Sequence, residues 1–123
     1  MTVRKYNDRQ WPLAATPELT AKNAGAGNEV TFHVPPGALV LRVAAFTGQA
    51  FDGAATLTLK DEATTFINAQ DLTSAGSETA TGAPKFYPTG GLFTASIAGT
   101  PTVGSVVLAV EYVVKDRGNE VQE

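Results

Sequence analysis

The chain has 123 residues, no cysteine and a formal net charge of −3. Its length predicts one domain around one hydrophobic core, and the absence of cysteine excludes disulfides and thiolate metal sites. The negative charge argues against nucleic acid as the main partner, because binding to phosphates requires a basic surface.

Residues 1–28 show neither helical nor strand periodicity, and prolines and glycines interrupt them, so we expect an extended N-terminal arm. Within it, residues 1–22 carry four basic and two acidic side chains. The arm also holds large apolar groups, which disordered tails usually lack. We predict that it docks on its own body or on a neighbouring protein; a solvated polar tail is the alternative. The residues expected to bind a partner are Arg4, Lys5, Tyr6, Arg9, Trp11 and Leu13.

The N-terminus also bears on targeting. Its first eleven residues, MTVRKYNDRQW, have no apolar run behind their basic side chains, so they do not look like a secretory signal. No stretch of the chain approaches the roughly 20 apolar residues that a membrane span requires. We therefore expect neither export through a signal peptide nor a membrane partner.

Strand patterns begin at Val30. In residues 29–34 apolar and polar side chains alternate, which is typical of a half-buried strand. The Pro-Pro-Gly sequence that follows predicts a turn. Residues 38–46 are then apolar on both faces apart from Arg42, which predicts a central strand covered, or nearly covered, on both sides.

The rest of the chain continues this pattern, with one exception. In residues 61–76, Phe66, Ile67, Ala69 and Leu72 fit one face of a short helical turn, so we expect a crossover with one turn of helix. The remaining expected strands lie within 56–60, 77–82, 85–88, 90–99 and 105–115, and the last of these has the strongest pattern.

These patterns together predict the fold. Seven or eight short strands, with turn residues about every 8 to 12 positions and no long amphipathic helix, favour an all-β protein. We expect a β-sandwich, of which the jelly roll is one version. The predicted organisation is an extended arm at 1–28, a β-sandwich domain at 29–116 and a polar C-terminal tail at 117–123.

No residue pattern indicates catalysis, a cofactor or a bound metal. The single histidine, His33, lies on the polar side of its strand, where a solvated imidazole is expected, and no serine lies in a nucleophile-elbow sequence. The glycine-rich segments do not join a strand to a helix, as a phosphate-binding loop must. Five carboxylates that could pair lack calcium-loop spacing: Asp52, Asp61, Glu62, Asp71 and Glu78. Asp52 is better explained as a turn residue and Asp71 as a cap, and the adjacent Asp61 and Glu62 would point to opposite faces of a strand.

One stretch resembles a known class of proteins. A Pro-Gly turn leads into the apolar strand at 35–43, an Ala-Phe-Asp-Gly loop follows at 50–53, and a Leu-x-Leu strand follows at 57–59. The last part is a crossover that contains Phe66, Asp71, Leu72 and Gly76. Across residues 30–76 this pattern resembles small virion proteins of tailed bacteriophages, including capsid decoration (cement) proteins and related β-sandwich structural proteins.

The resemblance implies a non-catalytic protein, made in the host cytoplasm and located in the virion, that decorates and stabilises a capsid by binding across major capsid subunits. It also implies a homo-oligomer, and we favour a trimer. The low share of charged residues, 17%, fits a surface that is partly buried by partners. The alternatives are a tail or head–tail joining protein, and a β-sandwich module that binds carbohydrate or a host surface.

Overall fold

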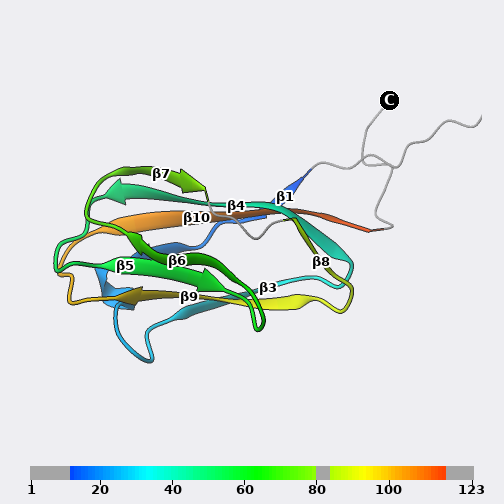
Figure 1. Cartoon of the computed structure of the whole chain (residues 1–123), viewed down its shortest axis with the longest axis horizontal. Coiled ribbons are helices and arrows are strands. Elements are labelled where there is room, and N and C mark those ends of the chain that lie inside the picture. The colour runs from blue at the N-terminus through cyan, green and yellow to red at the C-terminus, as the bar shows by residue number, and fades with distance from the viewer. Residues whose placement is uncertain (1–11, 80–83, 116–123) are drawn as a thin grey trace, which may run out of the picture.

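The computed structural model describes residues 12–79 and 84–115. Over these residues the chain forms ten strands in two antiparallel sheets, with a single turn of 3₁₀ helix (Figure 1). The elements are β1 (Leu13–Ala15), β2 (Glu18–Thr20), η1 (Ala21–Asn23), β3 (Val30–Val34), β4 (Ala38–Gln49), β5 (Thr56–Lys60), β6 (Thr65–Asp71), β7 (Gly76–Thr79), β8 (Lys85–Tyr87), β9 (Gly91–Ala98) and β10 (Ser105–Val114).

The two sheets stack as a sandwich. In sheet A, β10 and β4 are central; β1 and β2 pair in turn with β10, and β7 and β8 pair in turn with β4. Sheet B has the order β3-β9-β5-β6. Sheet A is the upper layer in Figure 1 and sheet B the lower. β1 and β2 occupy one edge of sheet A, and β7 and β8 occupy the other. Apart from the connections within these two edges and the β5–β6 hairpin, every connection crosses from one sheet to the other, and this strand order is that of a jelly roll.

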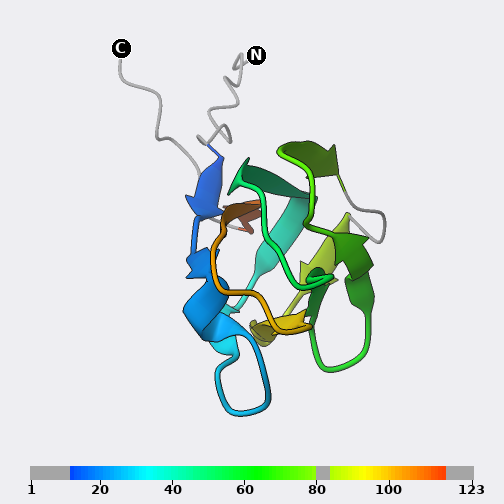
Figure 2. The same ribbon diagram turned by 90° about the vertical axis from the view of Figure 1, so that its left-hand side faces the viewer.

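The predicted all-β sandwich is therefore confirmed. The strand number exceeds the expected seven or eight because β1 and β2 lie in the segment expected as an extended arm, and β6 lies in the segment expected as a crossover. In Figure 2, β1 and β2 (blue) lie one after the other along one edge of the sandwich. Among the described residues, no helix is long and apolar enough to cross a membrane.

The core lies between the sheets, where the inward residues of each alternating strand meet. Phe93 is fully buried at its centre, and its ring stacks on Phe32 and Phe66 with centroid distances of 5.3 and 5.4 Å. Burying each such side chain contributes about 1.5–3 kcal/mol. The other large side chains with almost no exposure are Leu19, Leu57, Leu59, Leu72, Leu108, Val34, Val40, Val43, Val106 and Val110.

The described part of the N-terminal arm begins with two short strands that form an edge of sheet A, and a 3₁₀ turn at Ala21–Asn23 follows. Leu13 pairs with Tyr112, and Leu19 pairs with Val106 and is fully buried. Between the two short strands, the carbonyl of Pro17 accepts a hydrogen bond of 2.9 Å from the amide of Leu108. Strand pairing therefore starts at Leu13 rather than at Val30, because a proline is tolerated on an edge strand.

The helical turn expected within residues 61–76 was wrong, because residues 65–71 form β6. Leu59 pairs with Ile67 and the next residue, Lys60, pairs with Thr65, so Phe66 is an extra residue in β6. Such a bulge turns two consecutive side chains to the same face. Phe66 and Ile67 are accordingly both buried. Two consecutive buried residues do not fit a regular strand, and this is why the sequence pattern suggested a helical turn.

Candidate functional sites

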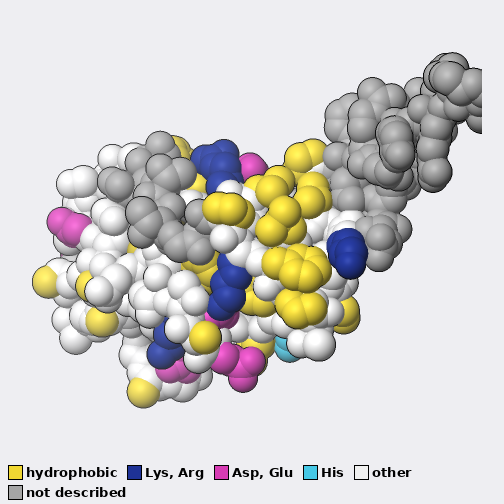
Figure 3. Space-filling view, turned by 45° about the vertical axis from the view of Figure 1, so that its right-hand side comes forward, with side chains coloured by type: hydrophobic (Ala, Val, Ile, Leu, Met, Phe, Trp, Pro, Cys, Tyr) yellow, Lys and Arg dark blue, Asp and Glu magenta, His cyan; other side chains and the backbone are white. Residues whose placement is uncertain are grey.

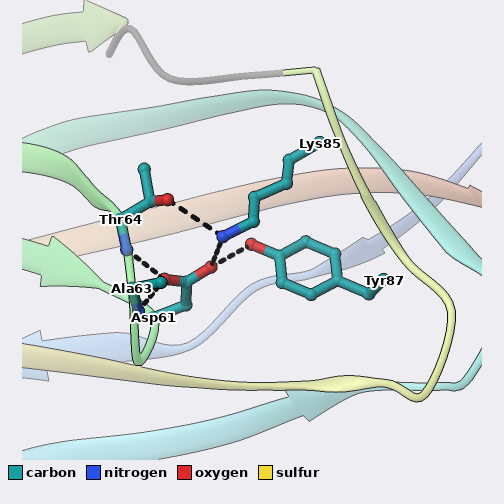
Figure 4. A network of polar contacts seen from close by, with 5 residues as sticks. All are labelled: Asp61, Ala63, Thr64, Lys85 and Tyr87. Atoms are coloured by element: carbon teal, nitrogen blue, oxygen red, sulfur yellow. Dashed lines mark hydrogen bonds and ion pairs between the residues drawn. The ribbon is translucent and has the colours of Figure 1, made fainter.

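A buried polar cluster closes one end of the sandwich. Asp61, at the turn after β5, has a side chain only 4% exposed, and it accepts hydrogen bonds of 2.6 Å from both Lys85 Nζ and Tyr87 Oη (Figure 4). Its other oxygen accepts from the backbone amides of Ala63 and Thr64, and Lys85 also donates to Thr64 Oγ1 at 2.9 Å. We call Asp61, Thr64, Lys85 and Tyr87 the Asp61 network.

The electrostatics of the network follow from these contacts. Burial alone would raise the pKa of Asp61, but the hydrogen bonds from Lys85, Tyr87 and two backbone amides outweigh burial and lower it to about 2. Burial, the hydrogen bond to Asp61 and the negative charge of Asp61 all raise the pKa of Tyr87. The Lys85 ammonium lies 5.1 Å from the centre of the Tyr87 ring, a favourable cation–π distance. Asp61 is therefore a stable carboxylate and Tyr87 a stable phenol.

The network joins the two sheets. Asp61 and Thr64 belong to the β5–β6 turn of sheet B, whereas Lys85 and Tyr87 belong to β8 of sheet A. A Cβ at Gly91 would lie 2.5 Å from the Tyr87 ring, so this glycine makes room for the ring. The four acceptor positions of the Asp61 carboxylate are all used. We interpret the network as a clamp, although a pocket of about 260 Å³ opens beside it.

The other polar residues considered from the sequence are local structural groups. Asp52 accepts bonds of 2.6 Å from the amide and the hydroxyl of Thr102, which lower its pKa and tie the β4–β5 loop to the turn before β10. Asp71 likewise accepts from the amide and hydroxyl of Thr73. His33 is exposed on β3. Among the described residues, no three metal-ligating side chains come together.

The outer face of sheet A has a different character. Four of its large apolar side chains are more than a third exposed: Leu41 at 38%, Phe46 at 54%, Phe86 at 43% and Val107 at 37%. Figure 3 shows hydrophobic side chains gathered beside basic ones toward the end where β8 lies. The sequence predicted β4 as a central strand covered, or nearly covered, on both faces. It is central, but within one chain its outer face is open.

The outer face of sheet B is polar instead. Its outward side chains on β3, β5 and β9 include Thr31, Thr58, Thr94 and Ser96, and none of its outward side chains among the described residues is a phenylalanine, tyrosine or tryptophan. Sugar-binding surfaces commonly use aromatic side chains to stack on rings. This face therefore offers no support for a carbohydrate site.

Of the partner-binding residues predicted in the arm, the structure describes one. Leu13 is half-buried and pairs with Tyr112 in the protein's own sheet. Arg4, Lys5, Tyr6, Arg9 and Trp11 lie outside the described residues, as does the polar tail at 117–123. The sequence analysis missed the Asp61 network, because its members are adjacent only through sheet pairing and no spacing along the chain marks them.

Solved structures similar to this chain include two from phage capsids. One belongs to "Cyanophage Pam1 capsid asymmetric unit", with a TM-score of 0.66 and 17% identity over 93% of this chain and 92% of that chain. The other belongs to "Capsid of Ralstonia phage GP4", with a TM-score of 0.54 and 17% identity over 93% and 91%. At these identities the likeness shows a shared fold. No protein-family model matches the sequence, and no curated protein matches it.

Proposed function

We propose that this chain is a non-catalytic virion structural protein that decorates and stabilises a phage capsid by binding across major capsid subunits. The observation that carries the proposal is the coverage of the structural similarity: nearly the whole chain aligns with nearly the whole of one chain from each of two phage capsids. Its location would be the virion, after synthesis in the host cytoplasm.

The polar groups support the non-catalytic part of the proposal. An enzyme needs an acid, base or nucleophile with a free position for substrate. Asp61 has its acceptor positions filled by the protein's own donors, so it has no free position for a substrate. His33 is exposed on β3, opposite Leu92 of β9.

Stabilisation would arise from the number of contacts. Many modest contacts made across several capsid subunits add up when they form together, and a protein that binds only the assembled shell shifts the equilibrium toward it. We propose that residues 1–11 extend the contact area through Arg4, Lys5, Tyr6, Arg9 and Trp11. On the shell we favour a homo-oligomer, and specifically a trimer placed where capsid subunits meet.

Co-sedimentation with undecorated particles tests the proposal. The full chain should pellet with the particles, and Trp11→Ala should weaken binding about tenfold or more, because an interface tryptophan can contribute a few kcal/mol. Raising the salt concentration should weaken binding further, since it screens the basic residues of the arm. Failure of the full chain to bind capsids, with binding to purified tails instead, would favour a tail or head–tail joining protein.

A pair of truncations supplies the control. Removing residues 1–11 leaves all described strands intact, so this variant should melt like the full chain while binding less tightly. Removing residues 1–22 also deletes β1, β2 and the buried Leu19, so that variant should be strongly destabilised. Full binding by the shorter truncation would show that residues 1–11 make no contact with the capsid.

A further inference from the structure

The outer face of sheet A is organised as cross-strand rows on the two central strands. Along β10 and β4 the outward partners are Val107 with Phe46, Ala109 with Ala44, and Glu111 with Arg42. After a register shift, the next outward row is Val113 with Leu39. From one end of the face to the other, the four rows therefore consist of large apolar, small apolar, charged and large apolar side chains.

A β-bulge produces the charged row. Val40 pairs with Tyr112 and Arg42 pairs with Glu111, so Leu41 is an extra residue in β4. The bulge turns Leu41 and Arg42 outward side by side. Arg42 Nη1 lies 3.4 Å from Glu111 Oε2, and the two side chains are 54% and 35% exposed. An ion pair this exposed contributes little to the stability of one chain, so both charges remain available to a partner.

These rows are complementary to themselves. Consider a line that runs over the outer face of sheet A, midway between β4 and β10 and parallel to both. The outward residues of β4 lie on one side of this line and those of β10 on the other: Phe46, Ala44, Arg42 and Leu39, and Val107, Ala109, Glu111 and Val113. Rotation of a second copy by half a turn about this line places each residue over its row partner. Apolar groups then meet apolar groups, and each Arg42 meets the partner's Glu111.

We propose that this face binds a second copy of the same chain, about a two-fold axis parallel to β4 and β10. A two-fold contact needs one surface patch that complements itself, and the four rows meet this condition. A two-fold axis in the same plane but perpendicular to the strands, passing over the charged row, would instead place Arg42 over the partner's Arg42, and such opposition of like charges is unfavourable. The charge pattern therefore selects the axis along the strands.

This pairing is independent of the capsid, because it needs only the isolated protein. It is also distinct from a trimer, since a three-fold ring joins two different patches. A pair formed through the outer face of sheet A leaves the outer face of sheet B to other contacts, including those that would form a trimer on the shell.

The mass of the full chain in solution gives the first test. At micromolar concentration, light scattering should give twice the 12.8 kDa of one chain. Phe46→Lys places a charge in the apolar row and should weaken pairing about tenfold or more. Thr31→Lys, on the outer face of sheet B, is the matched control and should leave the mass unchanged. A single-chain mass for the unaltered protein, or a larger assembly that Phe46→Lys leaves intact, overturns the proposal.

Cross-linking tests the axis. Because the chain has no cysteine, each introduced cysteine reports one position. Ala44→Cys protein, carrying a short tag, is mixed with Ala109→Cys protein and treated with a short bismaleimide. The tagged–untagged product should exceed the product that either protein forms alone, because Ala44 faces the partner's Ala109. Equal or greater cross-linking of Ala44→Cys with itself would contradict the proposed axis.

The same Phe46→Lys protein separates the two possible occupants of the face. If it loses pairing but still pellets with undecorated particles, a second copy covers the face, as proposed. If the unaltered chain is a monomer and Phe46→Lys abolishes particle binding, the capsid covers the face and the pairing proposal fails.

Discussion

The Asp61 network and the outer face of sheet A each contain an ion pair, and the two pairs differ in almost every physical respect. The Lys85–Asp61 pair has a distance of 2.6 Å, and the carboxylate is 4% exposed. The Arg42–Glu111 pair is longer, at 3.4 Å, and exposed on both sides. The first pair is surrounded by the protein's own donors and acceptors, whereas the second lies among apolar side chains that face solvent.

The contrast shows which region suits which role. A buried carboxylate with all its acceptor positions filled is part of the fold, because any ligand would first have to displace those bonds. An exposed apolar face with a weakly held ion pair adds little to the fold, so its composition is better explained by a partner. The hydrogen bonds of the Asp61 network thus close one end of the sandwich, whereas the outer face of sheet A is open for the contact that we propose.

The largest effect expected from a single change is that of Asp61→Ala. It removes the acceptor for Lys85 and Tyr87 and for two backbone amides, so the free energy of unfolding should fall by about 3 kcal/mol. Urea or thermal unfolding measures this. Glu62→Ala, at the exposed neighbouring position, is the control and should change stability by less than about 0.5 kcal/mol. If Asp61→Ala and Glu62→Ala changed the free energy of unfolding equally, the Asp61 network would stabilise the fold no more than an exposed carboxylate does.

Acid should weaken the network by a smaller amount. The pKa of Asp61 in the folded protein is about 2, below its ordinary value of 3.8. A lowered pKa gives stability that is complete above about pH 4 and is lost as the pH falls toward 2, on the order of 2 kcal/mol in total. Unfolding measured across this range should show a drop that Asp61→Asn reduces. An unchanged pH profile in that variant would show that other carboxylates control acid unfolding.

On the open face, Arg42→Ala should hardly alter the stability of one chain. Exposed ion pairs contribute at most about 1 kcal/mol, and often much less. Unfolding is best compared at protein concentrations low enough to suppress pairing, since association adds its own stabilisation. A loss comparable to that of Asp61→Ala would mean that the exposed pair supports the fold after all.

The smallest expected effect is that of His33→Gln. The imidazole is exposed on the outer face of sheet B and is not a member of the Asp61 network. We expect unchanged unfolding, pairing and particle binding. Loss of particle binding by a folded His33→Gln protein would reveal a functional site on sheet B.

The sequence predicted the sandwich because alternation and turn residues are local signals. It mispredicted β6 because the extra residue Phe66 disturbs the two-residue period, and no single sequence marks a bulge in advance. It also missed β1 and β2, since three-residue edge strands beside Pro17 are too short to show periodicity. Their place in the fold depends on pairing with β10, almost a hundred positions away along the chain.

The candidate sites divide in the same way. The apolar outward residues of β4 were visible in the sequence as a strand apolar on both faces apart from Arg42, which predicted a covered surface. The Asp61 network was not visible, because Asp61 and Lys85 are 24 positions apart and meet only when sheet B packs against sheet A. Local composition therefore indicated the face where we propose that a partner binds, and tertiary packing alone determined the Asp61 network.

Electron cryomicroscopy of the particle that contains this protein tests most directly our proposal that it decorates a phage capsid. We expect density for the jelly roll on the shell, with each copy in contact with more than one major capsid subunit and with residues 1–11 among the contacts. Density confined to the neck or tail, with none on the shell, would contradict it.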